Sequence, residues 1–581
     1  MNGTGYCART CDGDEGDCAI GDLGTWPGRT HGILTLEACA AACRRCSRCR
    51  YVSYSSRNDD CSWFHSCSIQ HLGLDWGGDS YTSLAVRPPL ESEPGGARWR
   101  PRAARGRPLL TFRTAEERLI RAASPASRVQ LGTSWLDDVQ ASNGVVRAST
   151  DPSLACFVRA AERRPVRIAA IGGSVTAGLA WSVLSGAQLD ANHILYHRKL
   201  ALWLNQAWPS TQRATTVRNC GLPGAGPAFA ALCLQSIVEL SVLTAKPDLV
   251  LLEFAVNAVD QSDVGWLELL LRQLHRAGVA AIVVNAHVFG DGKRCVQQIC
   301  APSSSFRYDE RGSLEPQIER LAKRYRTPLV SLRRAVFDDL GTPPVTLSNF
   351  MRDCKHPSAQ GHSWLAQLIV EAMQQAVQGG AMRAQRCRGR RPPPLPPPLT
   401  PLGGLEVGGG VKCLHAAALH AALVGTSGFW LVNGTKPGLR SVGPPGSWLR
   451  LRLPIDAGEG ASVHLGFLQS WRPGMGAARV RCEAPCACPP LALPAHDPTQ
   501  PVSVTKIRAL HVQPPAAVAD GGAAVGCVLR LQTEAGGKGG AEFMLSHAIV
   551  SIHRESVTNE LKWLFHLASH QNFSVFGPQV R

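Results

Sequence analysis

The sequence predicts an α/β unit with a doubly wound parallel sheet, flanked by a small disulfide-rich N-terminal module and a C-terminal antiparallel β-sandwich. Three observations support this fold class. Apolar strand patterns alternate with amphipathic helical patterns between residues 151 and 385. Nine of the 21 cysteines lie before residue 70. Short runs of alternating apolar and polar residues, separated by Gly and Pro, fill residues 405–550.

Length and linker composition place the domain boundaries. A chain of 581 residues is too long for a single hydrophobic core. We expect a cysteine-rich module at 1–88, a basic Pro/Gly/Arg linker at 89–150, the α/β unit at 151–385, an Arg/Pro-rich linker at 386–404, the sandwich at 405–550 and a tail at 551–581. The proline run at 392–401 predicts a stiff polyproline II spacer that holds the sandwich away from the α/β unit.

The cysteines of the first module indicate a disulfide framework, because so many thiols are uncommon in a reducing cytosol. A zinc site on Cys43, Cys46 and Cys49 is the alternative, but no histidines stand at the spacing of a zinc finger. The odd cysteine total leaves at least one thiol unpaired or paired between chains.

The sequence also addresses compartment and membrane attachment. Sequons at Asn2, Asn433 and Asn572 permit N-glycosylation and agree with the disulfides in predicting a secreted or secretory-pathway protein. The chain opens without a charged and then apolar leader, so we expect a truncated or mispredicted start. No apolar run approaches the ~18 to 20 residues needed to span a bilayer, which predicts no membrane span.

The formal net charge of +17 is concentrated in the linkers. Arginines crowd the Pro/Gly/Ala-rich stretch at 98–113 and the segment 383–391 before the proline run. Because almost no aromatic residues interleave them, solvated linkers are favoured over a nucleic-acid site. We therefore expect no nucleic-acid partner, while attraction to acidic polysaccharide stays open.

The α/β unit is defined by five apolar strands and the helices between them. The predicted strands span 166–171, 215–219, 247–254, 279–288 and 328–332. The predicted helices include 232–243, 266–277 and 314–325. Active sites of such sheets lie beyond the carboxyl ends of the strands, and Ser174 follows the first strand at such an end.

The turn Gly172-Gly173-Ser174 suits a nucleophilic serine. It fits neither the phosphate-binding loop nor the dinucleotide-binding glycine pattern, so a nucleotide site is disfavoured. A serine nucleophile needs a tight turn that exposes its oxygen. It also needs a base, an orienting acid and oxyanion donors from elsewhere in the chain.

Three further blocks supply these parts in order: NCGLPG at 219–224, EFAVN at 253–257 and DCKHP at 353–357. With the serine turn they resemble the four blocks of the SGNH hydrolases, the GDSL-type serine esterases and acyltransferases, over about residues 160–378. The resemblance implies a flavodoxin-like sheet with Ser174 as nucleophile, His356 as general base and Asp353 as the group that orients the imidazole. It further implies an oxyanion hole made by the backbone N–H groups of Ser174 and Gly224 and the side-chain amide of Asn257. We expect no cofactor and no metal.

Each of these residues also has a structural interpretation. Asp353 could cap a turn, His356 could be a surface histidine, and Asn257 could end a strand by bonding its own backbone. The chain departs from the family pattern at Gly173 and Ala258, where the family has aspartate. These departures point either to a variant subgroup or to weakened activity.

The remaining histidines of the α/β unit are expected to be structural: His193, His197, His287 and His362. Of these, His287 is the strongest exception because it stands at a strand end. Cys354, between the predicted acid and base, is expected to form a disulfide.

The two outer modules carry resemblances of their own. In RCEAPCACPP, disulfides of Cys482, Cys486 and Cys488 with Cys413 or Cys527 are preferred over a metal site. The segment HLGFLQSWRPGMGAARVRC resembles one that accompanies SGNH domains in secreted algal proteins. The first region, with EACAAACRRCSRC, resembles PAN/apple-type modules, which bind carbohydrate or protein.

Together these features predict a secreted esterase that removes a short acyl group from a glycan through an acyl-enzyme at Ser174. Acetyl is the acyl group that we favour. Acylated carbohydrate is the expected substrate, and the terminal modules are expected to contact glycan or protein. An O-acyltransferase with the same triad is one alternative. A non-catalytic glycan-binding protein is the other, suggested by Gly173 and Ala258.

Overall fold

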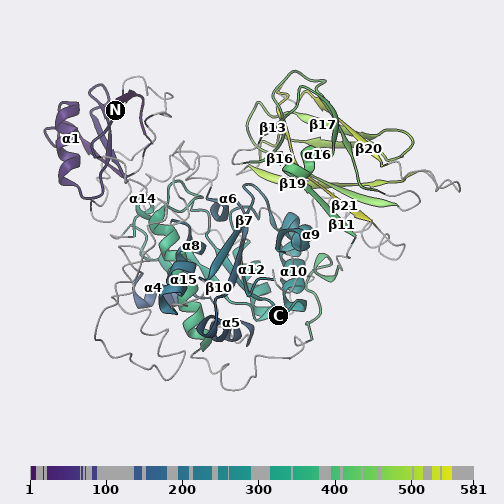
Figure 1. The fold of residues 1–581 in the computed structure, drawn as a ribbon. Helices are drawn as coiled ribbons and strands as arrows, with labels where there is room; N and C mark the ends of the chain where they lie inside the picture. The colour runs from purple at the N-terminus through teal and green to yellow at the C-terminus, as the bar shows by residue number, and fades with distance from the viewer. Residues whose placement is uncertain are drawn as a thin grey trace, which may run out of the picture.

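The computed structural model describes residues 2–7, 18, 23–65, 67, 69, 72, 81–87, 136–146, 152–178, 194–208, 214–238, 246–258, 261–289, 314–341, 345–377, 394–405, 410–432, 436–455, 460–499, 503–514, 526–536 and 540–552. The predicted tail beyond residue 552, both arginine-rich stretches, His193 and the sequons at Asn433 and Asn572 lie outside these ranges, while residues 551 and 552 end the last strand of the sandwich. Figure 1 shows the three parts of the chain in sequence colours.

The central unit is built on a five-stranded parallel sheet of order β10-β9-β8-β6-β7. The strands are β6 (Arg167–Gly172), β7 (Thr216–Gly221), β8 (Leu249–Glu253), β9 (Ala280–Asn285) and β10 (Leu329–Ser331). The strand order reverses at β6, as in flavodoxin-like sheets, and the switch point lies at the carboxyl end of that strand. The predicted α/β fold class is confirmed.

Helices cover both faces of this sheet, because alternate strand residues enter two separate cores. Ile168 and Ala170 of β6 pack with α5 (Pro152–Arg163), α8 (Tyr196–Ala207), α13 (Leu332–Val336), α14 (Leu347–Phe350) and α15 (Ala359–Ala376). Ala169 and Ile171 pack with α9 (Pro227–Val238), α10 (Gln261–Arg276) and α12 (Glu315–Tyr325). In the described part of the chain, no helix has the length and apolar content needed to cross a bilayer.

Part of the predicted 89–150 linker belongs to the α/β unit. Residues 138–144 form α4 (Asp138–Gly144), whose first turn is closed by a capping box between Asp137 and Gln140. Leu136 is buried in the first core and its backbone N–H donates to Gln367 at 3.0 Å. The linker therefore ends before residue 136. The sequence analysis missed this short helix because the helix contains few apolar residues.

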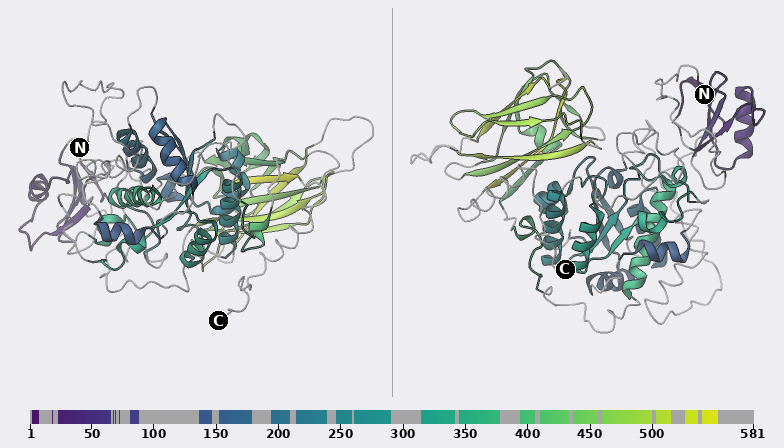
Figure 2. Two further views of the ribbon diagram at one scale, coloured as in Figure 1. Left: turned by 90° about the horizontal axis from the view of Figure 1, so that it is seen from below. Right: turned by 180° about the vertical axis from the view of Figure 1, so that it is seen from behind.

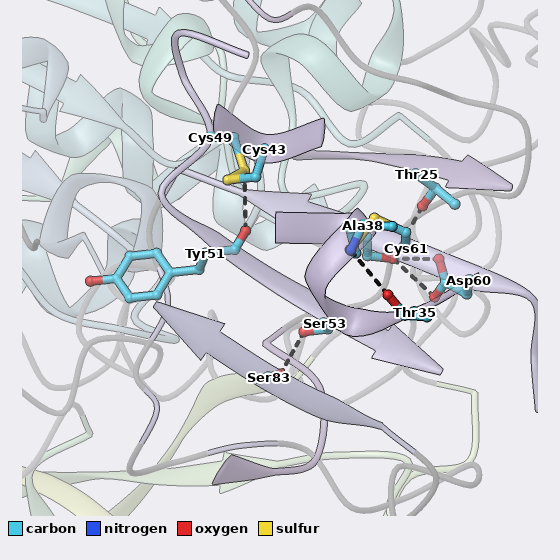
Figure 3. Close-up of a disulfide and its surroundings, with 12 residues drawn as sticks. Thr25, Thr35, Ala38, Cys43, Cys49, Tyr51, Ser53, Asp60, Cys61 and Ser83 are labelled. Carbon is cyan, nitrogen blue, oxygen red and sulfur yellow. Dashed lines mark hydrogen bonds between the residues drawn. A yellow bond between two sulfur atoms is a disulfide. The ribbon is translucent and has the colours of Figure 1, made fainter. Parts of the chain in front are cut away.

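The N-terminal module is an antiparallel sheet of order β1-β5-β3-β4-β2 with one helix, α1 (Leu36–Arg45). Its strands are β1 (Asn2–Thr4), β2 (Leu23–Pro27), β3 (Tyr51–Ser55), β4 (Asp60–Phe64) and β5 (Thr82–Ala85). Cys39 and Cys43 stand one turn apart on α1, so both face the sheet and are fully buried. Figure 3 shows the Cys43–Cys49 disulfide and its surroundings.

The disulfides of this module are Cys7–Cys67, Cys18–Cys46, Cys39–Cys61 and Cys43–Cys49. They use all three cysteines of the alternative zinc site, so that alternative is wrong. The predicted disulfide framework is confirmed for the described cysteines.

The C-terminal part is a sandwich of two antiparallel sheets around a single core, as predicted. One sheet has the order β13-β14-β21-β16-β19, with β11 also paired to β21, and the other has the order β12-β15-β20-β17-β18. The strands are β11 (Val411–His415), β12 (Leu423–Ser427), β13 (Trp430–Val432), β14 (Gly438–Ser441), β15 (Trp448–Arg452), β16 (Ala461–Gln469), β17 (Ala477–Cys482), β18 (Leu491–Pro494), β19 (Val504–Val512), β20 (Val528–Glu534) and β21 (Phe543–Ile552).

The disulfides of the sandwich agree with the expected pairing to Cys527 but not with the expected pairing to Cys413. Cys486 bonds Cys527, as predicted, and Cys482 bonds Cys488. Cys413, however, bonds Cys233 of α9 and thereby joins the sandwich to the α/β unit. The sequence could not show this pairing, because it depends on α9 lying against β11.

The predicted proline spacer is wrong. Residues 394–405 lie on the α/β unit, where Arg272 Nη1 donates to the Pro396 carbonyl at 2.7 Å. The backbone N–H groups of Leu399 and Thr400 donate to the buried Glu268 carboxylate at 2.6 and 2.7 Å. Carbonyls of proline-rich backbone are strong acceptors, and α10 supplies the charged partners that hold the segment down. The sandwich therefore lies directly against the α/β unit, which all views show (Figures 1 and 2).

Candidate active site

Ser174 stands two residues beyond the end of β6 and opens the short helix α6 (Ser174–Ala177). The turn requires glycine at 172, since an added Cβ there would lie 2.3 Å from Thr176 Oγ1 and 2.4 Å from the Glu253 carbonyl oxygen. The Gly173 N–H donates to the same carbonyl at 3.2 Å. These constraints hold the serine at the carboxyl end of the sheet.

Asp353 and His356 lie on the loop between α14 and α15. Asp353 Oδ1 accepts the backbone N–H groups of Lys355 and His356, both at 2.7 Å. Ser358 caps α15 by accepting from Gln360 and Gly361, and its hydroxyl donates to the Asn349 carbonyl at 2.7 Å. The loop is thus fixed at its base by the helix that follows it.

A continuous hydrogen-bonded chain joins the three predicted triad residues. His356 Nδ1 is 2.7 Å from Asp353 Oδ2, and His356 Nε2 is 2.9 Å from Ser174 Oγ. Burial acts to raise the pKa of Asp353, but its hydrogen bonds and the neighbouring imidazole outweigh that effect and hold the pKa below its ordinary value. Asp353 is therefore ionised at neutral pH and fixes the proton on Nδ1 of His356, which leaves Nε2 as an acceptor.

The two other predicted residues approach the same turn. Asn257 is 4% exposed, and its Oδ1 would lie 1.7 Å from a Cβ added to Gly173. The Ala225 carbonyl oxygen would lie 3.5 Å from that Cβ, and Gly224 before it has φ +84°. In the described part of the chain, no hydrogen bond is donated by the backbone N–H of Ser174 or Gly224 to another protein group.

This arrangement shows what the first departure from the family pattern accompanies. In this chain the Asn257 side chain fills the space that a side chain at residue 173 would need. Gly173 and Asn257 therefore form a matched pair, in which the asparagine packs directly on the turn before the nucleophile. Nothing in the structure explains Ala258.

A buried polar group that sequence reasoning missed lies behind the nucleophile. Glu253 ends β8, is 0% exposed, and accepts from the Thr176 hydroxyl at 3.5 Å; Thr176 is in turn 3.0 Å from the Tyr196 hydroxyl. Burial raises the pKa of Glu253 to about 8. The signal was present in the sequence, because Glu253 closes the otherwise apolar strand LVLLE.

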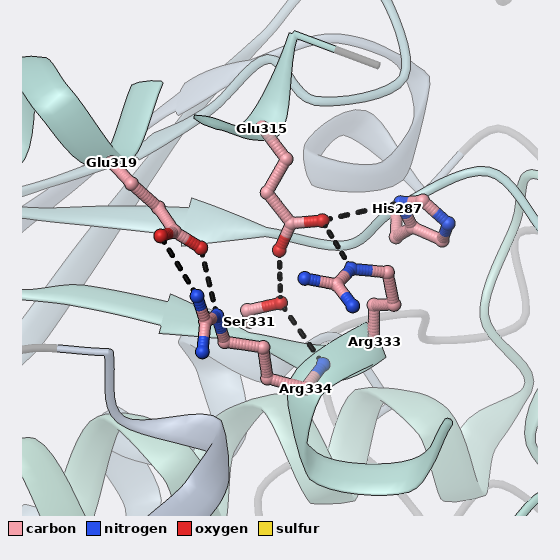
Figure 4. A network of polar contacts seen from close by, with 6 residues as sticks. All are labelled: His287, Glu315, Glu319, Ser331, Arg333 and Arg334. Atoms are coloured by element: carbon pink, nitrogen blue, oxygen red, sulfur yellow. Dashed lines mark hydrogen bonds and ion pairs between the residues drawn. The ribbon is translucent and has the colours of Figure 1, made fainter. Parts of the chain in front are cut away.

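The other histidines have structural contacts. His197 Nε2 is 3.1 Å from the Thr176 carbonyl oxygen, and the His362 ring stacks on Tyr196 at 6.0 Å between ring centroids. His287 Nδ1 is 3.7 Å from Glu315 Oε2, within the polar network of Figure 4. Burial, together with the nearby guanidinium of Arg333, lowers the pKa of His287 to about 3. These contacts support the structural interpretation.

The sandwich borders the candidate site on two sides. The Thr505 N–H of β19 donates to the Gly224 carbonyl at 2.7 Å, and residues 225 and 505 form a parallel bridge. The Lys355 ammonium, next to His356 in sequence, lies 5.2 Å from the centre of the Trp471 ring. Sequence reasoning treated the sandwich as a separate module and missed both contacts.

Comparison with known proteins agrees with this geometry. Residues 170–364 match the GDSL-like lipase/acylhydrolase family model. No curated protein sequence matches the chain significantly. Solved structures with some similarity include a two-domain esterase (CEX) active on acetylated mannans, with 17% identity, 71% of this chain and 99% of that chain covered, and a TM-score of 0.45. A mutant of the esterase AlinE4 has 19% identity, 38% and 98% coverage and a TM-score of 0.22.

The C-terminal CBM6 of LamC from Zobellia galactanivorans has 12% identity, 24% coverage of this chain, 98% of its own and a TM-score of 0.17. The family match begins within the strand that ends at the serine turn and includes the turn, the blocks at 219–224 and 253–257, and the loop that carries the histidine. The chain therefore carries a GDSL-like lipase/acylhydrolase domain, an ester-bond hydrolase with the SGNH fold.

Proposed function

We propose that the protein is a secreted carbohydrate esterase that removes a short acyl group through an acyl-enzyme at Ser174. Acetyl is the acyl group that we favour. The observation that carries this proposal is the unbroken Asp353–His356–Ser174 hydrogen-bonded chain at the carboxyl end of the sheet. A domain that had lost catalysis would have no need to keep all three side chains within hydrogen-bond distance of one another. The non-catalytic alternative is therefore disfavoured.

The chemistry follows from these positions. His356 Nε2 accepts the hydroxyl proton while Ser174 Oγ bonds to the ester carbonyl carbon, and the Asp353 carboxylate stabilises the resulting imidazolium. The backbone N–H groups of Ser174 and Gly224 and the side-chain amide of Asn257 stabilise the oxyanion. His356 returns the proton to the leaving sugar oxygen as its bond to the carbonyl carbon breaks. A water molecule then attacks the acyl carbonyl carbon with His356 again as base, and His356 returns the proton to Ser174 Oγ as the acid is released.

The accessory modules support a polymeric, extracellular substrate. The disulfides in both modules favour an oxidising compartment. The sandwich lies beside the triad loop, where it can hold a chain substrate against the nucleophile. An O-acyltransferase would use the same first half-reaction, with a sugar hydroxyl replacing water in the second.

The test compares the parent with Ser174→Ala and His356→Ala, expressed in an oxidising host. Matched controls are Ser427→Ala and His420→Ala, which change exposed residues of the sandwich. We expect p-nitrophenyl acetate turnover to fall about 10⁴-fold in both triad variants and to stay at the parental level in the controls. Triad variants that match the parent, while folded by circular dichroism, would remove this proposal. Acetate release from acetylated polysaccharide then separates hydrolysis from transfer to an added sugar acceptor.

A further inference from the structure

The second sheet of the sandwich, of order β12-β15-β20-β17-β18, has one face on the sandwich core and one face outside it. Strands of the first sheet make the contacts with the α/β unit, through Cys413 of β11, Thr505 of β19 and Ile549 of β21. Figure 1 shows β17 and β20 on the side of the sandwich that is distant from α9. In the described part of the chain, no residue of the second sheet belongs to either core of the α/β unit. The described part of the hydrolase therefore leaves the outward face of this sheet uncovered.

This outward face is rich in arginine. Along β15 the two leucines enter the sandwich core, so Arg450 and Arg452 point outward. The same alternation turns Arg530 of β20 outward. On β17 it does so for Arg479 and Arg481. Three adjacent strands thus present guanidinium groups on one surface.

Three of these arginines stand side by side across the sheet. Arg530 is the register partner of Arg450 on β15 and of Arg481 on β17. Directly opposed side chains have Cβ atoms about 4.5–5.5 Å apart, and like charges in such pairs destabilise a sheet. We refer to Arg450, Arg530 and Arg481 as the arginine row. The row is a costly arrangement unless something compensates its charges.

Counter-charge within the sandwich compensates part of this face. Arg450 pairs with Glu483 at 2.5 Å, and Arg479 pairs with Glu534 at 2.6 Å. Glu534 is the one acidic residue of the five strands, and Glu483 directly follows β17. The face is therefore left with an excess of positive charge.

The excess lies on exposed arginines. Among the described residues, Arg452, Arg481 and Arg530 make no ion pair with a carboxylate, and all three are exposed. Arg530 instead lies over the half-buried Trp448, with its guanidinium carbon 5.3 Å from the ring centre. This contact fixes the position of the central guanidinium of the row and places an aromatic side chain beside it.

We propose that the arginine row, with Trp448 beside it, is a docking surface for an anionic polysaccharide that carries carboxylate or sulfate groups. Guanidinium groups bind such oxyanions through charge-assisted and often bidentate hydrogen bonds. Neighbouring strands lie about 4.7–4.9 Å apart, so the row presents donors at regular short intervals to an extended polymer with anions along its length. An anionic ligand would also relieve the repulsion between the opposed arginines.

This inference rests on the proposed esterase function, since it names the charge of the polymer that the sandwich would hold. The disulfides favour an oxidising compartment, so a polysaccharide is favoured over a nucleic acid as the polyanion. The net charge of +17 would favour the approach of either polymer, and the test therefore includes both.

The test measures binding by the full-length chain without turnover. The parent is titrated calorimetrically with a galacturonate oligosaccharide, a sulfated galactan oligosaccharide, a neutral xylan oligosaccharide and a DNA duplex. The same titrations are made with the Arg481→Gln, Arg530→Gln double variant. The matched control is the Arg508→Gln, Lys323→Gln double variant, which removes the same charge from exposed residues of β19 and α12.

We expect at least one anionic oligosaccharide to bind, with an affinity that falls as salt is added, and the xylan and the DNA duplex to bind at least about tenfold more weakly. The Arg481→Gln, Arg530→Gln variant should lose at least about tenfold in affinity for that probe, because each charge-assisted hydrogen bond contributes roughly that factor. The control variant should stay within about twofold of the parent, since screening leaves little effect from distant exposed charges. The oligosaccharide that binds distinguishes carboxylate from sulfate.

Three outcomes would overturn the inference: no binding of either anionic oligosaccharide, equal binding of the xylan or the DNA duplex, or equal losses in the two double variants. Circular dichroism checks that both variants are folded. Absence of p-nitrophenyl acetate turnover in the parent would instead remove the proposed function and leave the binding result standing.

Discussion

The two accessory modules are both antiparallel and disulfide-linked, but they relate to the hydrolase in opposite ways. The described disulfides of the N-terminal module all join residues within it, and its two core clusters contain only its own residues. The sandwich is joined by Cys233–Cys413, and its Ile549 is fully buried in the second core of the α/β unit. In the described part of the chain, the core and disulfides of the N-terminal module are closed on themselves, whereas those of the sandwich extend into the hydrolase.

Helix α9 shows why the sandwich cannot be a detachable appendage. Its residues are buried around nearly the whole circumference, although it lies on the outer side of the sheet. A helix that is apolar all round must be covered on both sides, and the sandwich supplies the second cover. Phe229 of α9 contacts His547 of β21 at 4.6 Å between ring centroids.

The largest expected effect comes from removing each module in turn. A chain that ends at residue 405 exposes the apolar outer face of α9 and loses the Thr505 contact to Gly224, so we expect aggregation or a loss of more than 100-fold in p-nitrophenyl acetate turnover. A chain that lacks residues 1–88 should keep turnover within twofold of the parent. Size-exclusion chromatography and initial rates measure both. The comparison fails if the two deletions have equal effects.

A single backbone hydrogen bond should account for part of that difference. Thr505 lies on β19, an edge strand, and its N–H points to Gly224 instead of into a ladder with β16. Thr505→Pro removes this N–H at a position where an edge strand tolerates proline, and frees the loop that carries a proposed oxyanion donor. We expect kcat/KM for p-nitrophenyl acetate to fall about 10- to 100-fold, within the range for losing one oxyanion donor.

Thr505→Ala is the control for this change, because it keeps the N–H and removes only the side chain. It should retain activity within threefold. If the alanine variant loses as much activity as the proline variant, the side chain and not the backbone N–H couples the sandwich to the site.

The sequence predicted most of the fold but few of the contacts between its parts. The parallel strands and the alternation of the sandwich strands are local patterns, and both are confirmed, because burial on two faces or on one face leaves a period in the sequence. The four blocks are also local, since each is a short run of neighbouring residues. Cys233–Cys413, the docking of residues 394–405 and the Thr505–Gly224 hydrogen bond depend on how separate units pack. No local period encodes that packing, so the proline run suggested a spacer where the structure has a contact.

Within the candidate site, too, the residues could be predicted from local patterns, whereas the contacts between distant residues could not. Ser174, Asp353, His356, Gly224 and Asn257 were predicted from blocks of a few residues each, and the structure brings all five together. The fit of Gly173 to Asn257 required coordinates, because the two residues are distant in sequence and their relation is a steric one. Their catalytic roles stay predictions until the triad variants are measured.

The disulfide between the units should matter for stability more than for rate. Cys233 and Cys413 are 180 residues apart in sequence, whereas Cys43 and Cys49 close a short loop with a separation of 6. Replacing Cys233 and Cys413 together with alanine should lower the free energy of unfolding of the hydrolase by about 2–4 kcal/mol. The Cys43→Ala, Cys49→Ala double variant should leave unfolding of the hydrolase unchanged, as followed by loss of turnover in urea. Equal midpoints for the two double variants would contradict the comparison.

The contact between α9 and the sandwich should also weaken in acid. Burial, with a smaller contribution from the nearby His415 and His464, lowers the pKa of His547 to about 3. The unfolded chain takes up this proton near the ordinary pKa of 6.5 while the folded chain resists it until about 3, so stability is complete above pH 6.5 and falls as the pH is lowered toward 3. His547→Leu removes that titration, and its melting temperature should fall less between pH 7 and pH 5 than that of the parent, by a few degrees. His420→Leu, an exposed control on α16 (Ala417–Ala421), should follow the parent. A His547→Leu protein with the full acid sensitivity of the parent would place the acid-labile contact elsewhere and leave the disulfide and the Thr505 hydrogen bond as the features that distinguish the sandwich from the N-terminal module.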